Sequence, residues 1–219
     1  MTTSLAFLGG TGDQGRGLAR RYALAGHPVL IGSRSLERAE AAVAELLSNL
    51  PAGADVRGAT NLDAARAADL VVVAVPWEGH GALVSSVAEV LAGKIVIDCV
   101  NPLAFDAQGC FVLPVDEGSA AEQAAGLLPD SRVVAAFHHV SAVLLLDPTI
   151  ESFDTDVMVL GDDRDATDTV QALVDEIPGM RGIYAGRLRN ARQVEALTAN
   201  LIAVNRRYKS HAGLRVTDV

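Results

Sequence analysis

The stretch Gly9-Gly10-Thr11-Gly12-Asp13-Gln14-Gly15 decides the fold, because it joins a strand-like run to a helix-like run. An apolar run precedes it, and residues 16–25 follow with helical character. Its pattern is G-x-G-x-x-G at a strand-to-helix turn. Gly10 permits a tight turn, Gly12 lets a pyrophosphate approach the backbone, and Gly15 lets the helix pack close to the strand. The loop predicts a dinucleotide site at a helix N-terminus, and the alternative is an ordinary βα turn.

The first 100 residues alternate between the two kinds of run. Strands are predicted at residues 4–8, 28–32, 55–59, 70–75 and 94–98, and helices at residues 14–25, 35–47, 61–67 and 79–91. Continuous apolar runs such as residues 70–75 are typical of strands buried on both faces of a parallel sheet. The alternation predicts an α/β protein with a doubly wound parallel sheet of the Rossmann type.

The second half of the chain is less regular. A long loop is predicted at residues 99–114, and loops of this length often act as flexible lids. Helices are predicted at residues 119–128, 165–176 and 191–208, the last with Asn190 as its cap, and strands at residues 132–137, 157–161 and 180–184. We interpret residues 1–140 as a nucleotide-binding domain and residues 141–219 as a smaller C-terminal α/β portion packed against its sheet.

Composition argues against several classes of protein. The chain has 219 residues and a formal net charge of −9, which argues against nucleic acid or an anionic membrane as the main partner. No apolar run is long enough to cross a membrane, and no secretory signal is recognised, so we expect a cytoplasmic protein. Cys99 and Cys110 lack metal-ligand spacing, so no metal site is expected.

The residues after the second predicted strand indicate which dinucleotide binds. Ligands of such sheets collect at the carboxyl ends of the strands. Ser33 and Arg34 stand where NAD-binding folds usually carry Asp or Glu, and Arg38 follows one helical turn later. A guanidinium group binds a phosphate through two parallel hydrogen bonds. The pattern favours NADP over NAD; the alternative is that Ser33 caps the next helix and both arginines are merely solvated.

Two further features bear on the chemistry. Pro76 and Trp77 follow the fourth predicted strand, and the indole either forms a wall at the nicotinamide end of the site or packs in the core. The chain has two lysines, Lys94 and Lys209, and no tyrosine is followed by a lysine four residues later. The lysine-dependent acids of short-chain and hydroxyacid dehydrogenases are therefore not expected. The shortage of proton-transfer groups suits hydride transfer with little acid/base catalysis.

Five pieces of the sequence together resemble the F420-dependent NADP oxidoreductases. They are residues 9–15, Gly32-Ser33-Arg34, Val75-Pro76-Trp77, Ala136-Phe137-His138 and Glu195-Ala196-Leu197-Thr198, in that order along almost the whole chain. The resemblance implies reversible hydride transfer between NADP and coenzyme F420, an 8-hydroxy-5-deazaflavin. Both reactants then bring their own chemistry, and the protein has to place the two rings together.

The resemblance also assigns roles to individual positions. For the NADP site, it implies that the pyrophosphate loop is formed by Gly10, Thr11, Gly12, Asp13, Gln14 and Gly15, and that the 2′-phosphate is bound by Ser33, Arg34 and Arg38. It also implies that the cofactor site includes Pro76, Trp77, Asn101 and Ala142, with Trp77 and Ala142 against the nicotinamide half. For the second co-substrate, it implies that His138 and Val140 contact the deazaflavin and that Leu214 closes over it. His138 is the candidate catalytic residue, because its ring could hydrogen-bond the deazaflavin and bias its ionisation. The alternative is a satisfied histidine at a strand end.

Three residues depart from the family's pattern. Ser141 stands in place of a proline, His139 in place of a small polar residue, and Asn101 in place of an apolar one. Because of these three residues, the resemblance does not determine the shape of the deazaflavin pocket. A basic C-terminal cluster offers a candidate site for the acidic tail of F420, or is simply favoured by the helix dipole. Its members are Arg206, Arg207, Lys209, His211 and Arg215.

Two other functions stay open at this point. One is an NADP-dependent reductase of a small imine or carbonyl substrate, and the other is a non-catalytic protein that senses NADP(H). A homodimer is expected, since the apolar stripe of residues 191–208 can serve an interface as well as the core.

Overall fold

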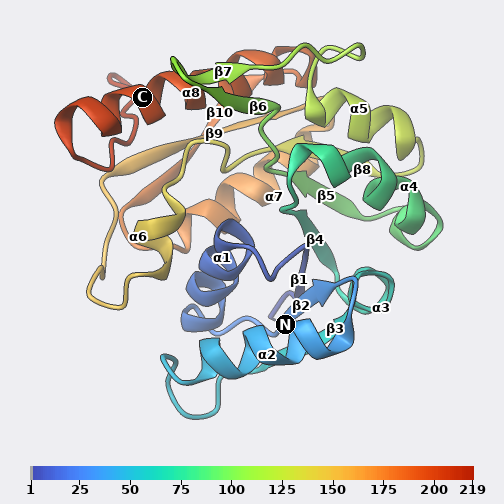
Figure 1. Cartoon of the computed structure of the whole chain (residues 1–219). Helices are drawn as coiled ribbons and strands as arrows, with labels where there is room; N and C mark the ends of the chain where they lie inside the picture. Colours follow the sequence, from blue (N-terminus) through green and yellow to red (C-terminus); the bar gives the residue numbers. More distant parts are fainter. Residues whose placement is uncertain (1) are drawn as a thin grey trace.

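The computed structural model, shown in Figure 1, describes residues 2–219 and contains one large sheet. The sheet has eight strands in the order β10-β9-β8-β5-β4-β1-β2-β3. Their bounds are β1 Leu5–Leu8, β2 Val29–Ser33, β3 Val56–Thr60, β4 Leu70–Val73, β5 Ile95–Asp98, β8 Arg132–Ala135, β9 Thr155–Gly161 and β10 Met180–Gly186. Strands β1 to β5 and β8 run parallel, as the alternation of strands and helices predicts. The doubly wound Rossmann sheet is confirmed.

Two layers of helices cover the sheet. Helices α1 (Asp13–Leu24), α2 (Leu36–Leu47), α6 (Ala142–Leu146) and α7 (Arg164–Asp175) pack on one face, and α3 (Asn61–Ala67), α4 (His80–Leu91), α5 (Ala120–Leu127) and α8 (Ala191–Tyr208) pack on the other. Strand β1 shows the division, because Leu5 and Phe7 join the first core while Ala6 and Leu8 join the second. Both faces of the central strands are therefore buried.

The C-terminal portion extends the same sheet. Strand β9 pairs antiparallel with β8, and β10 pairs parallel with β9, so the last two strands run opposite to the others. The turn from β8 toward α6 and the end of α8 meet near the carboxyl ends of the parallel strands. The C-terminal residues thus contribute to the edge where ligands of this fold collect. The division of the chain at residue 140 stays a prediction.

The prediction of one continuous loop at residues 99–114 is wrong. This segment contains an antiparallel hairpin of β6 (Leu103–Asp106) and β7 (Gly109–Val112), which lies beside α8 in Figure 1. The Asp106 carboxylate accepts hydrogen bonds from the backbone N–H groups of Gln108 and Gly109, and Gly109 has a φ of +129°. The hydrogen bonds of the Asp106 side chain stabilise this tight turn and the two strands that it joins. These strands are too short to be recognised from the pattern of apolar residues in the sequence.

The structure also bears on two helix caps: Asn190 is at the predicted position, and the alternative that Ser33 caps the second helix is wrong. The hydroxyl that caps α2 belongs to Ser35, which accepts from the N–H of Arg38, and not to Ser33, which ends β2. Asn190 occupies the N-cap position of α8, after the short 3₁₀ turn η2 (Leu188–Asn190), but its side chain makes no capping hydrogen bond. Throughout residues 2–219, no helix is both long and apolar enough to span a bilayer.

Candidate active site

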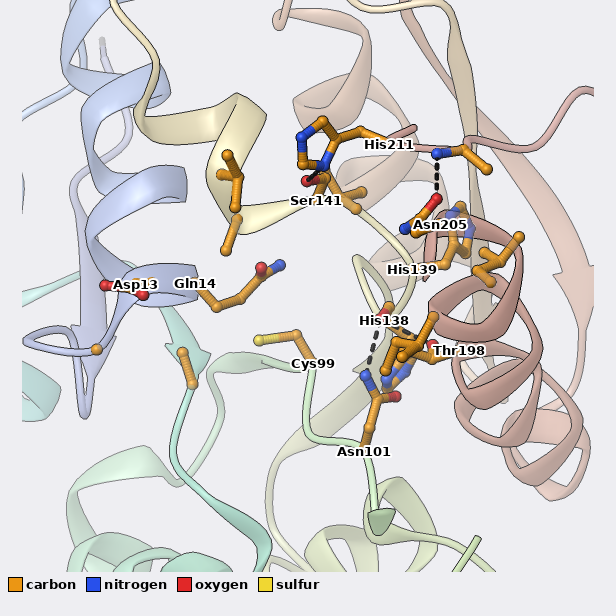
Figure 2. Close-up of a pocket in the computed structure, with 18 of the residues that line it drawn as sticks. Asp13, Gln14, Cys99, Asn101, His138, His139, Ser141, Thr198, Asn205 and His211 are labelled. Carbon is orange, nitrogen blue, oxygen red and sulfur yellow. Dashed lines mark hydrogen bonds between the residues drawn. The ribbon is translucent and has the colours of Figure 1, made fainter. Parts of the chain in front are cut away.

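A cavity of about 810 Å³ opens at the carboxyl ends of the parallel strands. Segments that follow four strands line it: Gly12–Gln14 after β1, residues 74–76 after β4, residues 99–101 after β5 and residues 138–143 after β8. Helix α8 and the C-terminal tail complete the wall. Figure 2 shows Asp13 and Gln14 on one side of this cavity and His138 and Thr198 on the other, with Cys99 and Asn101 on the segment between them. Residues distant in sequence thus share one site.

The glycine loop is shaped by close backbone contacts. The N–H of Gly10 donates to the carbonyls of Phe7 (3.1 Å) and Gly32 (3.0 Å), and a Cβ on Gly10 would lie 2.6 Å from the Phe7 oxygen. A Cβ on Gly15 would lie 2.7 Å from the Cα of Gly10. Side chains at Gly10 and Gly15 are therefore excluded by the backbone itself.

Gly12 differs, since its surroundings are open. A Cβ there would meet the carbonyl oxygen of Gly9 at 3.7 Å and nothing closer. Gly12 is the N-cap of α1 without a side-chain cap, so the first N–H groups of the helix are free to bind an anion. The space above Gly12 is therefore open, and Thr11 lies beside it in the same turn.

The loop is also held from outside by a residue that the sequence pattern does not reveal. Asn61, the first residue of α3, accepts a hydrogen bond from the N–H of Gly9 through Oδ1, at 3.1 Å. Gly9 has a φ of +70°, which a residue other than glycine rarely adopts. Asn61 is therefore part of the loop's support.

The proposed 2′-phosphate residues lie apart from the cavity lining. Ser33 is buried at the end of β2, whereas Arg34 and Arg38 are exposed around the start of α2. None of the ion pairs formed by residues 2–219 includes Arg34 or Arg38. Two guanidinium groups without a carboxylate partner, at the end of the strand beside β1, suit a phosphate ligand.

The turn after β8 is held by three side chains from three different elements. Phe137 has a φ of +64°, an uncommon value for a large residue. Gln14 donates to the carbonyl oxygen of Phe137 at 3.2 Å. Asn101 and Thr198 both donate to the next carbonyl oxygen, that of His138, at 2.8 Å and 3.0 Å. These hydrogen bonds fix the backbone that carries the candidate catalytic histidine.

The His138 side chain is buried, and among residues 2–219 it has no hydrogen-bond partner. It is 3% exposed, and neither ring nitrogen makes a hydrogen bond. Burial lowers the pKa of His138 to about 4, and burial likewise lowers the pKa of His139 to about 4. At neutral pH the His138 ring is therefore uncharged, with one N–H donor and one acceptor nitrogen.

Behind the cavity lies a buried set of polar groups. His80 bonds Asp98 at 2.6 Å and Gln123 at 2.8 Å. Glu195 of α8 accepts from two N–H groups at the start of α5, and burial raises its pKa to about 7. Trp77 stacks on His80 with ring centroids 5.5 Å apart, so the indole packs on this set and does not line the cavity. Its neighbour Pro76 does line the cavity.

The C-terminal tail crosses β9 and brings residues to the cavity. Leu214 is half-buried, donates to Thr155 Oγ1 and accepts from the N–H of Asp156, so it is anchored on β9 next to the lining. His211 lines the cavity and bonds the hydroxyl of Ser141 at 3.2 Å. Val140 and Ala142 line it as well. The tail and the start of α6 therefore meet at its rim.

The basic C-terminal cluster is divided by the structure. Arg215 forms ion pairs with Asp154 and Asp156, and this occupies its guanidinium group. Lys209 lines the cavity as His211 does, and Arg206 is exposed nearby on α8. A role in binding an acidic tail therefore stays a prediction for the lysine and the α8 arginines, while Arg215 serves the fold.

Sequence comparison places this architecture among known proteins. Residues 4–102 match the model of the family described as NADP oxidoreductase, coenzyme F420-dependent. The chain is 42% identical to the F420-dependent NADP reductase of Methanothermobacter thermautotrophicus over 227 residues, which cover 100% of this chain and 97% of that protein. It is 39% identical to the F420-dependent NADP reductase of Methanocaldococcus jannaschii over 222 residues, which cover 98% of each.

A solved structure agrees over almost the full length. The crystal structure of a putative F420-dependent NADP reductase from Arthrobacter sp. FB24 superposes with a TM-score of 0.84 at 30% identity, covering 98% of this chain and 99% of that one. The resemblance seen in the five sequence pieces is thereby confirmed. This chain belongs to the family of coenzyme F420-dependent NADP oxidoreductases.

Proposed function

We propose that this protein transfers a hydride reversibly between NADP(H) and coenzyme F420. One observation carries the proposal: a continuous cavity runs from the N-terminus of α1 at Gly12 to the His138 turn and α8. A nucleotide bound at the glycine loop would thus direct its nicotinamide into a space whose far side is formed by other residues. That space suits a second flat ring. The relatives' printed activity supports the same pair of reactants.

The residues present fit both co-substrates. The free N–H groups of α1 suit the pyrophosphate, and Arg34 with Arg38 suits the 2′-phosphate. The segment that follows β8 lines the cavity beside Val75 and Val100, and these surroundings suit a flat ring. When both co-substrates are bound, they supply the hydride donor and the hydride acceptor.

The protein's own contribution is placement. Burial raises the pKa of the Cys99 thiol well above its ordinary value, so it stays protonated, and His138 stays neutral. Neither group is suited to exchange protons rapidly near pH 7. The hydrogen bonds to the Phe137 and His138 carbonyls hold the site in a defined geometry, as a reaction between two positioned rings requires.

Further expectations belong to this proposal. Residues 1–140 would bind NADP, and residues 141–219 would complete the deazaflavin site through α6, α8 and Leu214. The protein would form a homodimer and act in the cytoplasm. His138 would hydrogen-bond the deazaflavin, and Pro76, which lines the cavity, would belong to the nicotinamide half of the site.

A spectroscopic assay tests the proposal. Purified protein is mixed with NADPH and oxidised F420, and the visible absorbance of the deazaflavin is followed. We expect loss of that absorbance with NADPH and much slower loss with NADH. NADPH binding without turnover would indicate a sensor, and turnover with small imines or carbonyls but not F420 would indicate a reductase of another kind. Either result would overturn the proposal.

A further inference from the structure

Arg21 of α1 is a buried cation that holds a second helix, α6. Its side chain is 6% exposed, and none of the ion pairs formed by residues 2–219 includes it. Burial lowers its pKa to about 10, so the guanidinium group is still charged at neutral pH. Its donors bind backbone carbonyl oxygens of α6 and of the turn that follows: Nε that of Leu145 at 2.8 Å, Nη1 that of Ile150 at 2.7 Å, and Nη2 those of Leu144 at 2.7 Å and Asp147 at 3.0 Å.

Helix α6 depends on this support. It has only five residues, and a helix of that length is not stable by itself. The last carbonyl groups of a helix have no partner inside it, and Arg21 supplies donors for those of Leu144 and Leu145. The guanidinium carbon also lies over the Phe153 ring, 4.7 Å from its centre. One side chain therefore closes the C-terminal end of α6 and fastens it to α1.

Gly17, one helical turn before Arg21, lets the two helices approach closely. A Cβ on Gly17 would lie 2.6 Å from the Cβ of Leu145, which is fully buried, and 3.6 Å from the carbonyl oxygen of Ala142. Alanine normally stabilises a helix interior relative to glycine, so a glycine here serves the contact between the helices. Figure 1 shows α6 beside α1. Gly17 and Arg21 thus fix the separation of α1 and α6 at two points.

The first turns of the same two helices line the cavity. Residues 12–14 at the start of α1 contribute to its lining, and so do residues 141–143 at the start of α6. The separation of the helices therefore determines where the α6 wall stands relative to the proposed nucleotide loop. Two rings react only when they are held in a near-attack geometry, and a displacement of about 1 Å can lower the rate by about 100-fold.

We infer that Arg21 and Gly17 are positioning residues for hydride transfer. By fastening α6 to α1 they set the place of Ala142 and Val143 against the bound rings, and they do so without touching either co-substrate. Neither is among the described residues that line the cavity. This inference rests on the proposed function, because it takes the two rings and the hydride transfer from it.

Two variants disturb the contact in different ways. Arg21→Lys keeps the charge but replaces the planar fork with a single ammonium group, whose three donors cannot bind four carbonyls. Gly17→Ala keeps Arg21 and adds a Cβ against Leu145, so α6 has to shift. The matched controls are Arg164→Lys, at the exposed start of α7, and Gly126→Ala, in α5, where a Cβ would meet nothing within 4 Å.

Single-turnover kinetics provide the test. An excess of protein saturated with NADPH is mixed with limiting oxidised F420, and the visible absorbance of the deazaflavin is followed by stopped flow. Once the rate constant no longer depends on protein concentration, a smaller folded fraction does not change it, so it reports the placement of the rings. We expect Arg21→Lys and Gly17→Ala to lower it by about 10- to 100-fold, and both controls to match the wild type. The dissociation constant of NADPH should stay close to the wild-type value, because the glycine loop is unchanged.

The contrary results are distinct. If either variant folds and keeps the wild-type rate constant, the inference is wrong while the proposed function stands. A loss of NADPH affinity as large as the loss of rate would also overturn it, because the nucleotide loop would then be the part disturbed. Should Arg21→Lys fail to fold, Gly17→Ala decides alone. If the wild type transfers no hydride to F420, the proposed function itself fails, and this inference fails with it.

Discussion

The side-chain amide of Gln14 donates a hydrogen bond to the backbone carbonyl of Phe137, at 3.2 Å. Gln14 lies in the first turn of α1, beside the proposed pyrophosphate site, and Phe137 precedes the candidate catalytic histidine. Phe137 has a φ of +64°, so its backbone depends on the surrounding structure to stay in place. One side chain thus connects the nucleotide loop with the turn on the opposite side of the cavity.

Replacement of Gln14 by leucine should weaken this connection. The variant removes one of two hydrogen bonds to the Phe137 carbonyl oxygen, because the N–H of Val140 also donates to it at 3.3 Å, and we expect the free energy of unfolding to fall by about 1 kcal/mol. Affinity for oxidised F420 should fall as well, because the His138 turn is less well held. Urea unfolding and titration with F420 measure the two effects. The same change at Gln193, which is exposed on α8, is the control; equal losses in both variants would contradict the proposed role of Gln14.

Gly12→Val should abolish NADPH binding in a folded protein. The nearest backbone atom to a Cβ at Gly12 is 3.7 Å away, so the fold accommodates the side chain, which then fills the space proposed for the pyrophosphate. NADPH fluorescence titration measures the binding, and circular dichroism checks the fold. Gly15→Ala is the contrasting variant: its Cβ would lie 2.7 Å from Gly10, so it should destabilise the protein. Normal NADPH affinity in folded Gly12→Val would refute the assignment of the loop.

Arg34→Ala should weaken NADPH binding selectively. A charge-assisted hydrogen bond contributes about 1.5–3 kcal/mol, so the dissociation constant should rise by roughly 10- to 150-fold. NADH lacks the 2′-phosphate, and its binding should change little. Arg57→Ala removes another exposed arginine, one paired with Asp55, and serves as the control. Equal losses for NADPH and NADH would show that Arg34 does not bind the phosphate.

Asp156→Asn should loosen the C-terminal tail. The buried Asp156 carboxylate accepts from Arg181, Arg215 and the N–H of Val216, and the flanking arginines hold its pKa far below the ordinary range. Removing this charge should lower the free energy of unfolding by about 2–3 kcal/mol and speed tryptic cleavage at Arg215. Asp154→Asn, at an exposed partner of Arg215, should cost less than about 1 kcal/mol. Similar losses for both variants would contradict this account.

Stability should decrease as the pH falls from about 6.5 to 4. Burial lowers the pKa of His138 and of His139 to about 4, whereas an unfolded histidine titrates near 6.5. Protons therefore bind the unfolded chain first, and each histidine removes about 3 kcal/mol of stability across this window. The stability that the two buried neutral histidines contribute is fully present above pH 6.5.

Urea unfolding at pH 7.5 and pH 5 measures this effect. His138→Gln removes one titrating group, so the loss between the two pH values should be smaller than in the wild type. Glu195 acts in the opposite sense, because burial raises its pKa to about 7 and its contribution is lost as the pH rises. Glu195 is present in both proteins, so its effect cancels in the comparison. An unchanged pH dependence in the variant would show that His138 is not buried as a neutral ring.

Local sequence patterns determined much of this protein. The alternation of apolar strands and helices predicted the parallel sheet, because burial of both faces requires continuous apolar runs. The glycine loop predicted an anion site at the N-terminus of α1. Its glycines are visible in the sequence because backbone crowding at Gly10 and Gly15 excludes side chains. Such features depend on neighbours in the chain, and a single sequence records them directly.

Tertiary structure alone decided how the site is held together. Gln14 bonds a carbonyl 123 positions away, Thr198 bonds one 60 positions away, and Asn101 bonds that same His138 carbonyl from 37 positions away. These contacts depend on the order of the strands and on where α8 docks, which no local pattern encodes.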